Sequence, residues 1–162
     1  AYKGGLLGEA AYQAAVSSMA ALNKAAAECL TAAEVFACTD ITGFGFLGHA
    51  AEMARASKVS LKIKARALPL LPEALEHASM GLIPAGAYEN RRHLEHDVVF
   101  AADVAQELED ILFDPQTSGG LLIPVRPEQA KLLLDELHRK GVTQAAIVGE
   151  VVPPGEVLIE VQ

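Results

Sequence analysis

The chain has 162 residues, of which 51% are hydrophobic, and its formal net charge is −8. This length and apolar content suit a single domain with a sizeable core, taken as residues 1–162. The acidic balance argues against a nucleic-acid binder, and no apolar run is long enough to cross a membrane.

The predicted elements alternate between helices and strands along the chain. Alanine-rich or amphipathic spacing predicts helices over 9–30, 46–55, 73–79, 104–112 and 127–140. Apolar runs predict strands over 35–38, 59–64, 98–101, 121–125, 145–152 and 157–161, whereas 83–93 is predicted to be a loop. This alternation indicates an α/β or α+β fold built on one layered sheet.

The most informative stretch is 35–49, where a short apolar strand leads through a polar turn into a glycine-rich helix start. Gly43 and Gly45 precede the helix, whose free N–H groups and partial positive charge suit a phosphate. Asp40 lies in the turn, and its carboxylate would repel that phosphate unless a cation lay between them. The local chemistry therefore predicts a metal–phosphate site with Asp40 as the metal ligand.

Two alternatives compete for the same residues. Gly43 to Gly48 also fits the G-x-G-x-x-G pattern of dinucleotide-binding units. Against it, residues 39–42 separate the strand from the first glycine, and the next strand ends in Lys62 and Lys64 instead of a ribose-binding acid. The second alternative is a glycine-rich connection that only packs a helix against a sheet.

Two later loops also carry polar groups. Arg91 and Arg92 can fork onto an anion, or they can be part of a solvated basic loop. Residues 114–120 place two hydroxyls and two glycines before an apolar strand, which suits either an anion nest or a structural turn.

The two cysteines, Cys29 and Cys38, form neither a zinc pattern nor a disulfide framework. A reduced, cytoplasmic setting is the simple inference. Cys38 alternates with Phe36 on its strand and is expected to be a buried apolar residue, not a nucleophile.

Three motifs combine into a family resemblance. In order they are residues 37–45 (ACTDITGFG), Pro84–Ala87 with Asn90–Arg91, and residues 112–122 (LFDPQTSGGLL). Together they closely resemble the C-terminal domain of the selenophosphate synthetase (selenide, water dikinase) family. That family belongs to a superfamily with aminoimidazole ribonucleotide synthetase, thiamine-monophosphate kinase and the hydrogenase maturation carbamoyl dehydratase.

The resemblance implies an α+β fold, a layered α/β/α sandwich with a mixed sheet. It implies a reaction that converts ATP, selenide and water to selenophosphate, AMP and phosphate with Mg²⁺. Asp40 would then be a magnesium ligand facing the ATP phosphates. The residues implied to line the phosphate side are Thr39, Thr42, Gly43, Gly45, Asn90, Arg91, Gln116, Thr117 and Ser118.

The family's N-terminal domain, with its reactive cysteine or selenocysteine, lysine and further metal-binding aspartates, has no counterpart in this sequence. No catalytic residue is therefore assigned in this chain, which is expected to be inactive alone. The expected partners are that N-terminal domain and, since the family is dimeric, a second copy. A regulatory or nucleotide-binding module without catalysis, and a related ATP-dependent enzyme of the superfamily, are the alternatives.

Overall fold

The computed structural model describes the backbone of all 162 residues and every side chain except that of Ala32. The helices are α1 (Glu9–Ala20), α2 (Lys24–Cys29), α3 (Gly45–Ser57), α4 (Ala74–Ser79), α5 (Ala85–His93), α6 (Gln106–Leu112) and α7 (Pro127–Arg139). The strands are β1 (Thr39–Asp40), β2 (Ser60–Ile63), β3 (Val98–Phe100), β4 (Leu121–Leu122), β5 (Gly149–Val152) and β6 (Ile159–Val161).

The larger sheet has the strand order β3-β6-β2-β5. Strand β6 pairs in parallel with both β2 and β3, and β5 closes the other edge antiparallel to β2. The register places Val98, Ile159 and Leu61 side by side, and because side chains alternate across a strand these residues share one face. The predicted α+β class with a mixed sheet is confirmed.

The main core lies between that face of the sheet and helices α3, α5 and α6. Helix α3 turns an alanine stripe inward, with Ala50, Ala51 and Ala54 at most 1% exposed. Such small side chains allow a helix to approach a sheet closely, while Leu47 and Phe113 fill the remaining volume. This packing fixes the start of α3, which is the glycine-rich stretch singled out in the sequence.

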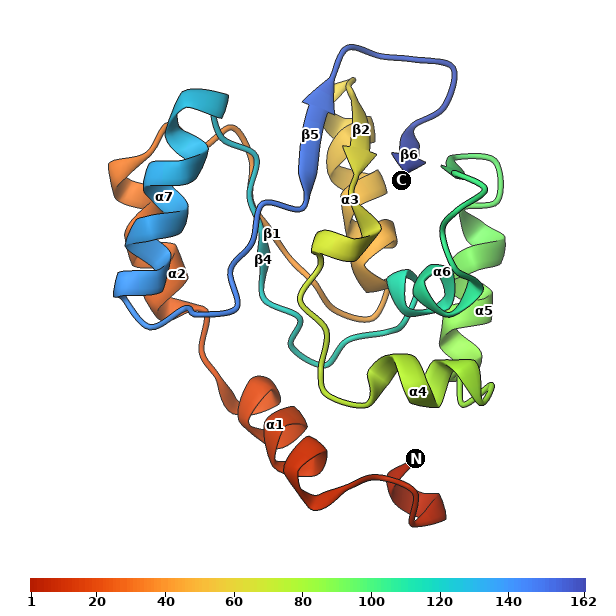
Figure 1. Cartoon of the computed structure of the whole chain (residues 1–162). Coiled ribbons are helices and arrows are strands. Elements are labelled where there is room, and N and C mark those ends of the chain that lie inside the picture. Colours follow the sequence, from red (N-terminus) through yellow and green to blue (C-terminus); the bar gives the residue numbers. More distant parts are fainter.

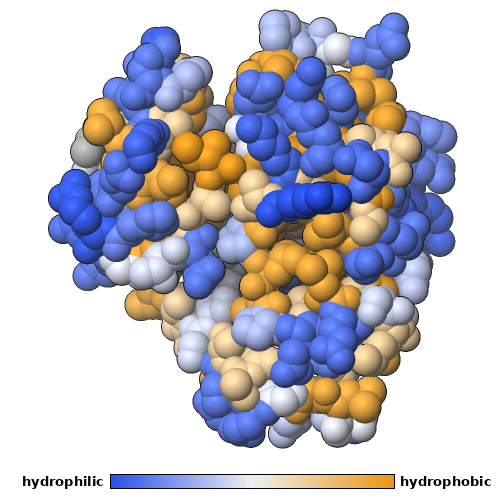
Figure 2. Space-filling model, viewed as in Figure 1, coloured by the Kyte–Doolittle hydropathy of each residue, from blue (hydrophilic) through white to orange (hydrophobic). Residues whose placement is uncertain are grey.

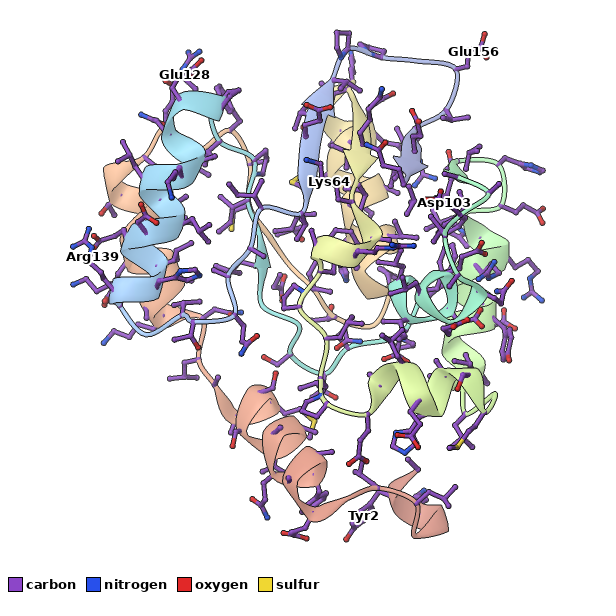
Figure 3. All side chains as sticks on the ribbon, in the orientation of Figure 1. Tyr2, Lys64, Asp103, Glu128, Arg139 and Glu156 are labelled. Carbon is purple, nitrogen blue, oxygen red and sulfur yellow. The ribbon has the colours of Figure 1, made fainter. Side chains whose placement is uncertain are left out.

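A second, smaller core joins α2 to α7, where Cys29 and Ala26 meet Leu133 and Leu137. Figure 1 shows this helix pair beside the larger sheet, with the two-stranded sheet β1-β4 running between the two parts. On the same face, Figure 2 shows apolar residues gathered between α7 and the larger sheet. Figure 3 shows Glu128 and Arg139 at the two ends of α7, near the positive and the negative end of its dipole respectively.

Three predicted elements were wrong, and the strands predicted over 121–125 and 145–152 are shortened to β4 and β5. The helix predicted over 9–30 is two helices, because Ala21 adopts an extended backbone and ends α1. Residues 85–93, predicted as a loop, form α5, whose Ala87 is buried against the main core. The strand predicted over 35–38 is reduced to a single bridge between Val35 and Val125, and the regular pairing begins at Thr39.

Over the described residues, no helix is both long enough and apolar enough to cross a membrane.

Candidate functional site

Strands β1 and β4 bring the two glycine motifs side by side. Asp40 is opposite Leu121 in the antiparallel register, so the strand ends that carry the motifs meet. Past the strands, the Ile41 N–H donates to the Gly120 carbonyl at 3.0 Å, and the Gly119 N–H donates back to the Ile41 carbonyl at 2.8 Å. Two segments far apart in the sequence therefore form one continuous loop platform.

The platform continues through Thr42. Its carbonyl accepts hydrogen bonds from the Gly45 N–H at 2.9 Å and from the Gln116 N–H at 3.0 Å. Gly45 has a φ of +69°, a left-handed conformation that glycine adopts without strain. A Cβ atom at Gly45 would lie 2.7 Å from the Phe113 carbonyl oxygen, so the close approach of the two loops requires a glycine at this position.

The third motif joins the platform through Asn90 on α5. Its side-chain amide donates to the Gly43 carbonyl at 3.1 Å and to the Phe113 carbonyl at 2.9 Å. At the first turn of α5, a Cβ atom on Gly86 would lie 2.7 Å from the Pro115 side chain. All three motifs of the sequence analysis thus converge, and Asn90 is placed as a cross-link between the other two.

Asp40, the predicted metal ligand, is the last residue of β1 and is exposed. Among the side chains that the structure describes, no cationic group lies within 4 Å of its carboxylate. Cys38, two residues earlier, is also exposed, so the prediction that it is buried was wrong. Desolvation and the charge of Asp40 both raise the pKa of the Cys38 thiol, which is opposite to what a nucleophilic thiolate needs.

Arg91 lies on α5, and its guanidinium faces two carboxylates of α6. Its guanidinium donates to Glu109 at 2.9 Å and to Asp110 at 2.8 Å. The same group lies 4.9 Å from the centre of the Phe113 ring, within cation–π range. Arg91 thus links α5 to α6. A phosphate would have to compete with these two carboxylates for the guanidinium of Arg91.

The predicted residues of the 114–120 loop differ in how far they are exposed to solvent. The Gln116 amide turns back to donate to the Asp114 carboxylate at 2.8 Å, whereas Thr117 is exposed and Ser118 is half-buried. Burial raises the pKa of Asp114, and the hydrogen bond from Gln116 opposes this shift. On the other side, the Thr39 hydroxyl donates to the Asp40 carbonyl at 3.2 Å, and Gly43 faces open space.

His49 is a polar residue beside the platform that the sequence analysis did not select. Its side chain is buried on α3, and its Nε2 atom lies 3.1 Å from the Thr42 hydroxyl. His49 lies seven residues after Thr42, just beyond the first turn of α3, and the loop before the helix folds back onto it.

A metal ion fits this site only in part. No group of three or more His, Cys, Asp and Glu side chains suited to hold a metal occurs among the described residues. Mg²⁺, however, keeps several waters and often uses only one or two carboxylates together with substrate phosphates. The exposed Asp40 carboxylate is compatible with that mode, with further ligands from outside the chain.

Comparisons with known proteins identify the family of the chain. The family model described as AIR synthase related protein, C-terminal domain, matches residues 4–162. A selenide, water dikinase of Pelobacter propionicus is 51% identical over 152 residues, covering 94% of this chain and 44% of the relative. A selenide, water dikinase of Clostridioides difficile is 44% identical over 161 residues, covering 99% of this chain and 46% of the relative. The chain thus spans less than half the length of these relatives.

Solved structures support the fold. The crystal structure of E. coli HypE, a hydrogenase maturation protein, superimposes with a TM-score of 0.55 at 22% identity, over 88% of this chain and 36% of that one. A chain of the HypE–HypF complex gives 0.54 at 20% identity, over 89% of this chain and 39% of that one.

Proposed function

The chain belongs to the family of AIR synthase related C-terminal domains, and on that premise we propose that it is the C-terminal half of a selenide, water dikinase. The relatives at 51% and 44% identity that carry this name support the proposal. Such an enzyme converts ATP, selenide and water to selenophosphate, AMP and phosphate, with Mg²⁺. An N-terminal half would complete the site, and the assembled enzyme is proposed to be a cytoplasmic homodimer.

One observation carries the proposed role of this half. An exposed carboxylate without a cationic partner among the described side chains, Asp40, lies at the point where two glycine-rich loops are hydrogen-bonded together. Bound Mg²⁺ would offset the negative charge of the ATP phosphates, with Asp40 as its ligand from this chain. The surrounding residues proposed for the phosphate side are Thr39, Thr42, Gly43, Gly45, Gln116, Thr117 and Ser118, with Asn90 and Arg91 behind them.

The same geometry supports the proposal that the chain alone does not make selenophosphate. Asp40 is the carboxylate placed at the strand end of the loop platform, and Cys38 beside it has a raised pKa instead of the low pKa of a reactive thiolate. The chemistry that attacks ATP must then come from the other half of the enzyme.

Calorimetry of ATP binding with and without Mg²⁺ tests the proposal, on the chain and on Asp40→Asn. The control is Asp103→Asn, an exposed aspartate that Figure 3 shows well away from β1. We expect Asp40→Asn to remove the Mg²⁺-dependent part of the affinity and Asp103→Asn to retain it. Since the N-terminal half is proposed to complete the site, the titrations are also run with the two halves mixed.

If Asp40→Asn binds ATP as tightly as the wild type, both with and without Mg²⁺, Asp40 is rejected as the metal ligand. That result would favour a nucleotide-binding module without catalysis. Selenide-dependent formation of AMP by the pure chain would reject the proposal that an N-terminal half is needed to complete the site.

A further inference from the structure

Helix α1 is poorly covered by the rest of the chain. Of its side chains, all of which the structure describes, only Ala11 is buried, and none belongs to the main core or to the smaller core. Figure 1 shows the helix projecting below both parts of the molecule. Every residue from 16 to 22 is exposed. A helix of 12 residues is only marginally stable in water without packing, so α1 lacks the cover that such a helix needs.

The exposed apolar side chains of α1 share one face of the helix. Tyr12, Val16 and Met19 recur at spacings of four and three residues, which aligns them along the helix as one stripe. Val16 is 37% exposed and Met19 47%, and Leu22, just beyond the helix, is 81% exposed. At the other end, the Tyr2 ring stacks on the Tyr12 ring with 4.8 Å between the ring centres. We call Tyr12, Val16 and Met19 the α1 stripe.

The composition of this segment is unusual for a helix that faces water. No residue from 10 to 23 is charged, although 21% of the whole chain is. The outer face of a surface helix normally carries charged and polar residues. Depletion of charge together with Tyr and Met is typical of the centre of a protein–protein interface. The α1 stripe therefore has the composition of a contact surface.

The start of α1 is held in place by the segment that leads into α4. The Gly8 N–H donates to the Glu73 carboxylate at 3.0 Å, and Nε2 of His77 lies 3.3 Å from the Leu6 carbonyl oxygen. These contacts anchor the first turn of the helix, whereas its second half, with Val16 and Met19, extends beyond them. The helix thus presents its stripe from an anchored base.

We propose that the α1 stripe is the surface on which the N-terminal half of the same enzyme docks, through an apolar patch of its own. This inference rests on the proposed function, because it takes the chain as a C-terminal half. The family model describes a C-terminal domain, and the chain spans less than half the length of the relatives it matches. In the proposed enzyme the other half precedes residue 1 and is tethered close to α1, which begins at Glu9.

The tether favours this occupant over a second copy of the chain. A partner joined by a short linker has an effective concentration on the order of millimolar. A second copy at micromolar concentration would have to compete with it for the same stripe. The absence of charge on the stripe also requires an uncharged surface opposite, because an unpaired charge buried there would be costly.

Hydrogen–deuterium exchange with mass spectrometry tests the docking, by comparing the chain of 162 residues with the full-length enzyme. We expect the amides of residues 13–20 to exchange on the order of a hundredfold more slowly in the full-length enzyme, because a docked helix must undock before it opens. The internal control is α7, whose buried face packs on α2 and should exchange at the same rate in both. Equal exchange of α1 in the two proteins would overturn the proposal.

Two variants of the full-length enzyme test which face of α1 is covered. Met19→Asp introduces a charge into the stripe, whereas Ser17→Asp introduces the same charge into the same last turn, about 200° around the helix. We expect exchange of α1 to become about tenfold faster or more in Met19→Asp and to stay at the wild-type rate in Ser17→Asp. Equal effects of the two variants would mean that the stripe is not the covered face.

Sedimentation velocity of the 162-residue chain tests the competing occupant. We expect a monomer at micromolar concentration. A dimer that Met19→Asp dissociates and Ser17→Asp does not would assign the stripe to a second copy and overturn the proposal.

The two proposals fail separately. Unchanged Mg²⁺-dependent ATP binding in Asp40→Asn removes the proposed metal role, whereas the exchange of α1 is measured without ATP or Mg²⁺ and decides the docking surface.

Discussion

Alanine substitutions at three glycines of the loop platform distinguish the cost of backbone strain from the cost of a steric clash. Gly45 combines a φ of +69° with a position where a Cβ atom would lie 2.7 Å from the Phe113 carbonyl oxygen. Gly120 has a φ of +84° but nothing within 4 Å of such an atom. Gly43 has nothing within 4 Å and no left-handed φ. Gly45→Ala therefore adds both backbone strain and a steric clash, Gly120→Ala adds backbone strain alone, and Gly43→Ala adds neither.

The expected losses in the free energy of unfolding follow from these differences. A left-handed conformation costs alanine about 1 kcal/mol, which is the whole effect expected for Gly120→Ala. For Gly45→Ala, forcing apart two backbone segments adds a further cost, for a total of about 3 kcal/mol. Gly43→Ala should change stability by less than about 0.5 kcal/mol.

Urea unfolding followed by circular dichroism measures the series. With a denaturant slope of about 2 kcal/mol per M, the midpoint should fall by about 1.5 M in Gly45→Ala and by about 0.5 M in Gly120→Ala. Equal midpoints for these two variants would refute the close contact between the loop before α3 and residue 113. A large loss in Gly43→Ala would refute its open surroundings.

Three further outcomes are expected. Asn90→Ala should lower the free energy of unfolding by about 2 kcal/mol, because two backbone carbonyls lose their donor, and urea unfolding measures it. Asp40→Asn should lower the pKa of Cys38, because it removes a negative charge that, in addition to desolvation, raises this pKa. Iodoacetamide should then alkylate Cys38 faster at a pH of about 8. An unchanged rate of alkylation would contradict the electrostatic effect of Asp40. Burial holds the folded-state pKa of Asp114 above its unfolded value, so its contribution to stability is fully present below the unfolded pKa and is lost as pH rises through the folded one. Asp114→Asn should flatten this part of the pH–stability profile measured by thermal unfolding, whereas an unchanged profile would speak against a raised pKa.

Much of the fold could be predicted because it depends on local patterns. The amphipathic period of 127–140 and the alternation of 59–64 are strong signals, and the structure has α7 and β2 in these places. Helix α5 was missed because its polar residues and glycine are typical of a loop, whereas in the structure it packs Ala87 against the main core. The first helix was predicted too long because no proline or glycine marks the extended backbone at Ala21.

The candidate site divides in the same way. The sequence by itself determined the candidate groups, namely the carboxylate of Asp40 and the glycines at the start of α3, and the family resemblance of the motifs. Their roles depended on neighbours that are distant in the chain. The resemblance implied that Arg91 and Asn90 line the phosphate side. In the structure Arg91 contacts two acids of α6, and the Asn90 amide donates to two backbone carbonyls.

Only the tertiary structure decided which groups the His49 ring meets. A sequence specifies which groups can donate or accept a proton, but the direction of a hydrogen bond depends on what faces each nitrogen. The helical turn of α3 sets Glu52 against Nδ1, and the folding of the loop back onto the same helix sets Thr42 against Nε2.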